Sequence, residues 1–169
     1  MPEYFSDTLG EIKYSGEFDY EGLYLCIYKW LKKKRYDLQE VYKHKMTGSG
    51  AEVELAFKGA KKINEFVKYK IDAEIKGWNI TEFEAVKDGK KQKLNKGRII
   101  VTINFAMDMD WQKKYQDSPF KKRVYNLITG TLLKKKAVLV WGGTLVGEAY
   151  QLHTEIKKQL SMETAYSAW

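Results

Sequence analysis

The chain has 169 residues, which is enough for one domain with its own hydrophobic core. Apolar residues make up 44% of the sequence and aromatic residues 14%, so the composition excludes a chain that is disordered throughout. Thirty Lys and Arg residues against 22 Asp and Glu residues give a formal net charge of +8, which favours anionic partners.

Cysteine usage and the N-terminal segment predict a cytoplasmic location. The single cysteine, Cys26, has no partner for an internal disulfide and lies in an apolar helical run, which is typical of a reducing compartment. Residues 1–10 lack the basic and apolar regions of a secretory signal. No stretch approaches the roughly 18 consecutive apolar residues of a membrane span, so no transmembrane segment is predicted.

The first predicted elements are a strand over residues 10–18 and an amphipathic helix. The helix begins after Asp19, a suitable N-cap, and ends in the four cations of residues 32–35, where the helix dipole favours positive charge. Its apolar residues recur at spacings of three and four: Tyr20, Leu23, Tyr24, Ile27, Trp30 and Leu31.

A run of strands is predicted next, and its clearest members are residues 67–78 and 98–111. In both, apolar odd-numbered residues alternate with polar even-numbered residues, which predicts an antiparallel sheet with one dry face. Asp88-Gly89 predicts a hairpin turn between two further strands. The other predicted strands cover residues 38–46, 53–57, 80–86 and 90–94.

The remainder is predicted to be helical, beginning at Ser118 as N-cap with Pro119 in the first turn. The apolar stripe consists of Phe120, Val124, Leu127 and Ile128, followed by Leu145, Ala149, Leu152, Ile156 and Leu160. Gly130 and the pair Gly142-Gly143 predict bends, or a close approach of the helix to the sheet. Residues 1–164 are predicted to form a single domain and residues 165–169 a loose tail.

This order of elements predicts an α+β fold. We expect a curved antiparallel sheet of about five to six strands, packed against one N-terminal helix and one or two long C-terminal helices. The order resembles the helix-grip arrangement of START-like proteins. It departs from that arrangement in having one N-terminal helix where a pair is usual, and a longer helical tail. The resemblance implies a carrier or enzyme for a hydrophobic small molecule held between sheet and C-terminal helix.

A second, local resemblance rests on two stretches, "LNKGRIIVTINF" (residues 94–105) and "YQDSPFKKRVYNLITG" (residues 115–130). In this order they resemble a group of small uncharacterised archaeal proteins, in which a meander strand precedes a Pro-Phe helix start. The resemblance covers residues 20–160 and implies no known activity.

No pattern in the sequence predicts a metal site or a catalytic reaction. His44 and His153 lie far apart and, even with Cys26, do not give the short paired spacings of a zinc site. Asp108 and Asp110 share the polar side of a strand end, where pairing with nearby lysines is favoured over catalysis. We therefore predict no cofactor and favour a binding or scaffolding protein over an enzyme.

Basic clusters are the functional signal on which we base the main prediction. Six cations and a single acid lie between Lys87 and Arg98. We predict that these clusters neutralise phosphates of a nucleic acid or another acidic surface, in a manner that depends on salt. The predicted anion-binding residues are Lys90, Lys91, Lys93, Lys96 and Arg98, with Lys33, Lys34 and Arg35 behind them.

Three alternatives stay open. A hydrophobic ligand would lie in a cavity lined by Tyr69, Ile71, Ala73, Val101, Ile103 and Phe105, although a filled core is the usual state of a small domain. The many aromatic residues would also suit a homo-oligomer or a subunit of a larger assembly. The segment 127–143, "LITGTLLKKKAVLVWGG", could contact a membrane through Trp141, but we favour two helical segments whose apolar faces cover the sheet.

Overall fold

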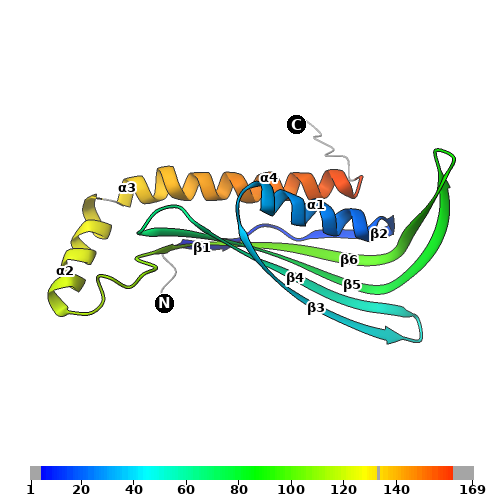
Figure 1. The fold of residues 1–169 in the computed structure, drawn as a ribbon, viewed down its shortest axis with the longest axis horizontal. Helices are drawn as coiled ribbons and strands as arrows, with labels where there is room; N and C mark the ends of the chain where they lie inside the picture. The colour runs from blue at the N-terminus through cyan, green and yellow to red at the C-terminus, as the bar shows by residue number, and fades with distance from the viewer. Residues whose placement is uncertain (1–4, 133, 162–169) are drawn as a thin grey trace.

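The computed structural model describes residues 5–132 and 134–161, which form one antiparallel sheet with helices on one face (Figure 1). The strands are β1 (Phe5–Thr8), β2 (Ile12–Phe18), β3 (Asp37–Thr47), β4 (Gly50–Lys62), β5 (Val67–Lys87) and β6 (Lys90–Met109). The helices are α1 (Tyr20–Lys33), α2 (Pro119–Leu127), α3 (Lys134–Lys136), α4 (Gly143–Gln159) and two π-helical turns, η1 (Ile128–Leu132) and η2 (Ala137–Gly142). The predicted α+β class is confirmed.

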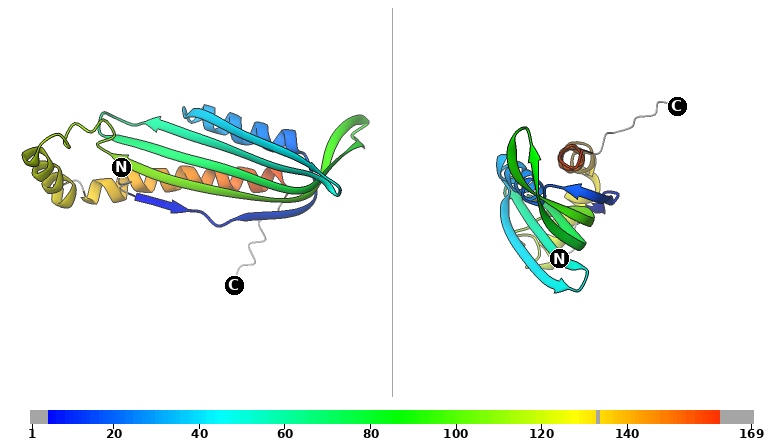
Figure 2. Two further views of the ribbon diagram at one scale, coloured as in Figure 1. Left: turned by 90° about the horizontal axis from the view of Figure 1, so that it is seen from below. Right: turned by 90° about the vertical axis from the view of Figure 1, so that its right-hand side faces the viewer.

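The sheet has the order β1-β6-β5-β4-β3, and β2 also pairs with β6. Because the side chains alternate along β5 and β6, the odd-numbered residues of 67–75 and 99–109 are buried, as predicted. The predicted neighbouring strands are also confirmed, since Val67 lies opposite Met109 and Ile75 lies opposite Val101. The sheet curves around α1 and α4, which lie on the same face (Figure 2).

The prediction of separate strands at 67–78 and 80–86 was wrong, because both belong to the single strand β5. The register with β6 shifts between Trp78 and Thr81, and Asn79 there has a φ of 55°. A bulge of this kind turns the strand without ending its ladder of hydrogen bonds. The predicted hairpin turn at Asp88-Gly89 is confirmed.

The predicted first helix is confirmed as α1. The Asp19 carboxylate accepts a hydrogen bond from the backbone N–H of Gly22 at 2.8 Å and so caps the helix. Leu23, Ile27 and Leu31 are fully buried against the sheet and α4.

The last helix, α4, covers the dry face of the sheet with the predicted apolar stripe, since Leu145, Ala149, Leu152, Ile156 and Leu160 are buried. The helix does not break at Gly142-Gly143, where the sequence offered a bend or a close approach to the sheet. Gly142 has helical angles, φ −63° and ψ −46°, so η2 runs into α4 without interruption. Gly130 lies in η1, where the helical path changes direction between α2 and α3 (Figure 1). Residues 162–169, which include the predicted tail, lie outside the described residues.

Helix α2 does not cover the sheet, in contrast to α4. Ser118 caps α2 as predicted, with its Oγ accepting from the N–H of Lys121 at 3.2 Å, yet no residue of α2 is buried. The reason is position: α2 lies beyond the end of the sheet, where no apolar strand surface faces it (Figure 1). Among the residues described, no helix combines the length and apolarity that crossing a bilayer requires.

Candidate functional site

The cations on the open face of the sheet are largely matched by acids. Lys70 pairs with Asp108 at 2.8 Å, which confirms the predicted pairing of that carboxylate with a lysine. Lys43 pairs with Glu54 at 3.1 Å, and Lys76 with Glu74 at 3.2 Å. The middle of this face therefore offers an anion little net charge.

The β5–β6 hairpin divides the predicted anion-binding residues between its two faces. Lys93 pairs with Glu82 at 3.1 Å and Lys91 approaches Glu84 at 3.9 Å, so these two cations already have acidic partners. Alternation along β6 places the other three on the opposite face. They are exposed and have no ion pair with any described residue: Lys90, Lys96 and Arg98.

The second predicted group of cations lies elsewhere in the molecule. Lys33 and Arg35 are exposed at the C-terminal end of α1, and the Lys34 ammonium lies 5.6 Å from the centre of the Trp30 ring. The hairpin tip is at one end of the long axis, whereas this end of α1 lies toward the middle (Figures 1 and 2). The two predicted groups of cations do not form one surface.

The residues predicted to line a cavity belong to the hydrophobic core and are at most 4% exposed: Tyr69, Ile71, Ala73, Val101, Ile103 and Phe105. The hydroxyl of Tyr69 donates a hydrogen bond to the carbonyl oxygen of Trp141 at 2.7 Å. These side chains lie between the sheet and α4, as expected from the alternation.

The longest stretch of the sequence without an acid lies elsewhere in the chain. Between Asp117 and Glu148 the sequence contains six Lys and Arg residues and no acid, and we call residues 118–147 the acid-free segment. It covers α2, η1, α3, η2 and the first turns of α4. Its cations are Lys121, Lys122, Arg123, Lys134, Lys135 and Lys136. The sequence analysis weighed a membrane contact at residues 127–143 but did not note that residues 118–147 contain no Asp or Glu.

The acid-free segment also exposes large apolar side chains. Phe120 is 76% exposed, Leu127 63%, Leu139 74% and Val140 52%. Single exposed apolar residues are ordinary, but here four of them fall within 21 residues of the chain. Exposed cations lie beside them in the sequence, namely Lys121, Lys122, Arg123, Lys135 and Lys136.

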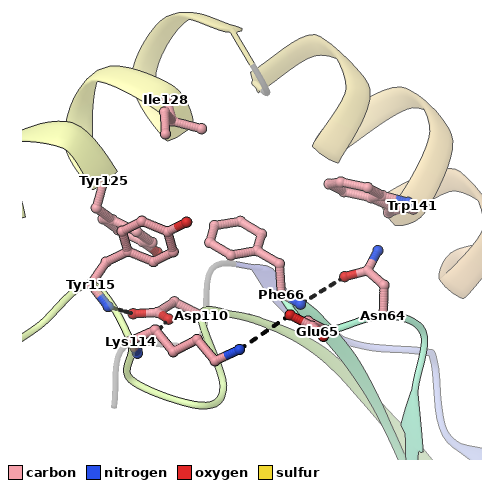
Figure 3. Close-up of a pocket in the computed structure, with 9 residues that line it drawn as sticks. All are labelled: Asn64, Glu65, Phe66, Asp110, Lys114, Tyr115, Tyr125, Ile128 and Trp141. Atoms are coloured by element: carbon pink, nitrogen blue, oxygen red, sulfur yellow. Dashed lines mark hydrogen bonds and ion pairs between the residues drawn. The ribbon is translucent and has the colours of Figure 1, made fainter. Parts of the chain in front are cut away.

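Below this segment lies an aromatic cleft of about 440 Å³ (Figure 3). Its apolar lining consists of Phe66, Tyr115, Tyr125, Ile128 and Trp141. The Phe66 ring lies between the two tyrosines on one side and Trp141 on the other, with ring centres 6.0 Å from both Tyr115 and Tyr125. Helix α2 thus rests on the sheet end through aromatic ring contacts, rather than through a buried helical face.

The charged groups of the aromatic cleft already have partners. The Asp110 carboxylate, 1% exposed, accepts hydrogen bonds from the backbone N–H groups of Lys114 at 2.9 Å and Tyr115 at 3.2 Å. At the rim, the Lys114 ammonium pairs with Glu65 at 3.1 Å. Asp110 therefore orders the loop after β6, and the cleft retains an apolar character.

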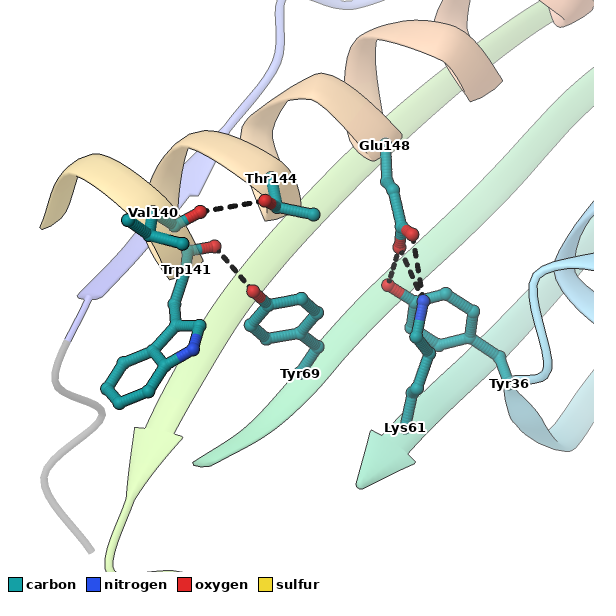
Figure 4. A network of polar contacts seen from close by, with 7 residues as sticks. All are labelled: Tyr36, Lys61, Tyr69, Val140, Trp141, Thr144 and Glu148. Atoms are coloured by element: carbon teal, nitrogen blue, oxygen red, sulfur yellow. Dashed lines mark hydrogen bonds and ion pairs between the residues drawn. The ribbon is translucent and has the colours of Figure 1, made fainter. Parts of the chain in front are cut away.

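Polar contacts anchor the start of α4 to the sheet (Figure 4). Glu148 accepts hydrogen bonds from the Lys61 ammonium at 2.8 Å and from the Tyr36 hydroxyl at 2.6 Å. Burial raises the pKa of Tyr69 to about 12, and burial together with Glu148 raises the pKa of Tyr36 well above its usual value. These contacts hold α4, and with it η2 and Trp141, in a fixed position over the sheet.

Neither metal ligation nor sequence comparison points to a reaction. Across residues 5–132 and 134–161 no three His, Cys, Asp or Glu side chains gather as metal ligands would. His44 is exposed on β3, and His153 is half-buried on α4, where burial lowers its pKa. No family model matches the chain, and no curated protein matches its sequence.

Proposed function

We propose that this protein is a peripheral binding protein for an anionic membrane surface, which it contacts through the acid-free segment. The observation that carries the proposal is the coincidence of exposed large apolar side chains and exposed cations in one segment. At an acidic bilayer the apolar side chains enter the interface while the cations are attracted to lipid phosphates.

Other anionic or apolar partners would use only part of this surface. A nucleic acid would neutralise the cations but leave Phe120, Leu127 and Leu139 in water. Complete burial of such a side chain is worth about 1.5–3 kcal/mol, and a cation near an acidic bilayer about 1 kcal/mol. The two contributions are similar in size, so a partner that takes both is favoured. The predicted anionic partner is thus retained, but at α2–η2 rather than at the hairpin.

Vesicle co-sedimentation tests the apolar part of the proposal. We expect the protein to bind phosphatidylcholine vesicles that contain phosphatidylglycerol, and to bind phosphatidylcholine alone much more weakly. Leu127→Ala combined with Leu139→Ala should lower the partition coefficient roughly 30-fold, because each truncation removes about 1 kcal/mol of interfacial burial. Val86→Ala is the matched control, because Val86 is equally exposed on the hairpin, outside the segment. An equal loss in both variants would contradict the proposal.

A pair of charge variants tests the electrostatic part. Lys122→Gln combined with Arg123→Gln removes two exposed cations of α2, and Lys90→Gln combined with Lys96→Gln removes two exposed cations of the hairpin. We expect only the α2 variant to lose affinity, by roughly tenfold or more at low salt. A loss confined to the hairpin variant would move the anion-binding surface back to β5–β6 and refute the assignment to α2–η2.

A second function, the binding of a small uncharged ring compound, is favoured by the aromatic cleft. Its volume of about 440 Å³ lies within the usual range of ligand sites, and its charged groups are already paired. Ile128→Trp would fill the cleft. A ligand that native mass spectrometry detects on the wild-type protein and not on this variant would support the function. An identical, ligand-free spectrum for both proteins would contradict it.

A further inference from the structure

The two edges of the sheet are built differently. At one edge β6 pairs with two short strands, β1 and β2, which residues 9–11 separate. At the other edge β3 runs without interruption from Asp37 to Thr47 and pairs with β4 over its full length. Within the described part of the chain, no strand pairs with the outer side of β3 (Figures 1 and 2).

Strand β3 lacks most features that protect a sheet edge. Edge strands are usually short, or contain proline or a bulge, whereas β3 has 11 residues, no proline and no shift of register. It also exposes Val41, Tyr42 and Met46, the last to 71%. The backbone N–H and C=O groups along its outer side can therefore accept a further strand.

We propose that β3 pairs in antiparallel fashion with β3 of a second copy of this chain, centred on Tyr42, so that the two sheets become one. The axis of such a dimer is a two-fold perpendicular to the sheet, which keeps the helices of both copies on the same side. Residues opposite each other must then point to the same face, so each register is centred on a residue of β3.

The register centred on Tyr42 matches side chains on the helix-covered face. Tyr42 faces Tyr42 of the second copy, Glu40 faces His44, and Leu38 faces Met46. Because Tyr42 is the midpoint of Asp37–Thr47, all 11 residues are paired. This register also covers the exposed Met46 side chain with an apolar neighbour.

The two lysines of β3 do not oppose this register. Lys43 lies opposite Val41 of the second copy, and Lys45 lies opposite Gln39. The Lys43 ammonium is moreover directed toward Glu54 of its own sheet at 3.1 Å. A register centred on Lys43 would place two lysines face to face, and one centred on Glu40 would do the same with two glutamates. Centring on Val41 would leave Met46 and Thr47 outside the paired length of β3.

Single-cysteine variants in a Cys26→Ser background test the register without any lipid, so their outcome is independent of the vesicle experiments. Directly opposite residues of antiparallel strands have Cα atoms about 4.5–5.5 Å apart, which a disulfide can span. We expect Tyr42→Cys to form a disulfide-linked dimer under mild oxidation. Val41→Cys and Lys43→Cys should each remain uncrosslinked alone, but should crosslink when mixed.

Light scattering over a concentration series gives an independent reading on the unmodified chain. We expect a monomer–dimer equilibrium that Tyr42→Lys shifts at least tenfold toward monomer, because it places two like charges on the axis. Val86→Lys, at an equally exposed apolar position on the hairpin, should leave the equilibrium unchanged. A strict monomer at all concentrations would overturn the proposal. Crosslinking of Val41→Cys or Lys43→Cys alone, with none for Tyr42→Cys, would overturn the register.

Discussion

Tyr36 provides a test of how α4 is held on the sheet. Its hydroxyl is buried and donates a hydrogen bond to Glu148, which also pairs with Lys61. Burial first, and then the Glu148 carboxylate, raise the pKa of Tyr36 above its usual value. An unfolded chain releases this proton near pH 10, whereas the folded protein keeps it. Tyr36→Phe removes the ionisable hydroxyl and retains the ring.

The direction in which stability changes with pH follows from the number of protons bound in the folded and unfolded states. Above about pH 10 the unfolded state binds one proton fewer than the folded state at this position, so the free energy of unfolding falls by about 1.4 kcal/mol per pH unit. Below about pH 10 the contribution is fully present. Tyr36→Phe should therefore flatten the fall in stability with pH by this amount. At neutral pH it should cost about 1–2 kcal/mol, because Glu148 loses one hydrogen bond.

Urea unfolding followed by far-UV circular dichroism, at about pH 8, 10.5 and 11.5, measures both quantities. Tyr69→Phe is the comparison, since the pKa of Tyr69 is raised only to about 12. Up to about pH 11.5 it should flatten the same curve by a similar amount, because the Tyr69 hydroxyl keeps its proton in the folded state over that range. If stability fell equally steeply with pH in the wild type and Tyr36→Phe, the Tyr36 hydroxyl would not be the buried, proton-retaining group described above.

Two further predictions concern packing and charge. Gly59→Ala should cost about 2 kcal/mol in urea unfolding, because a Cβ there would lie 2.8 Å from the carbonyl oxygen of Ile71, whereas Gly48→Ala, which meets open space, should cost much less. Replacing Lys90 and Lys96 by Gln should weaken retention on heparin more than replacing the ion-paired Lys91 and Lys93 by Gln. Equal effects would show that the pairing is immaterial.

The sheet could be predicted from sequence because period-two alternation is a local signal with one structural solution. Within residues 67–75 and 99–109, the alternation of apolar and polar side chains identifies the buried face of each strand without reference to any other part of the chain. The bulge at Asn79 leaves no such trace. The continuity of the helix through Gly142 also could not be predicted from the sequence. The hydrogen bond from Tyr69 to Trp141, which helps to fix the helix there, joins residues 72 apart in sequence.

Helical periodicity identifies which face of a segment is apolar, but not whether another element covers that face. Phe120 and Leu127 were predicted as members of an apolar stripe, and the stripe is left uncovered because α2 lies beyond the sheet. Counting charged residues in the sequence has a similar limit. Lys91 and Lys93 count as free cations in the sequence, and only the cross-strand register brings Glu84 and Glu82 to them. The absence of acids from residues 118–147, by contrast, needed no structure.

The two proposed surfaces have a joint consequence. The strands run along the long axis of the molecule, and α2 and η2 lie at one end of it (Figure 1). An antiparallel β3 pair therefore places the acid-free segments at opposite ends of the joined sheet, where they can contact two separate bilayers. We expect the wild-type protein to cluster acidic vesicles, detected by turbidity, and Tyr42→Lys to bind the same vesicles without clustering them. If Tyr42→Lys clustered vesicles as efficiently as the wild type, the link between β3 pairing and two-ended attachment would fail.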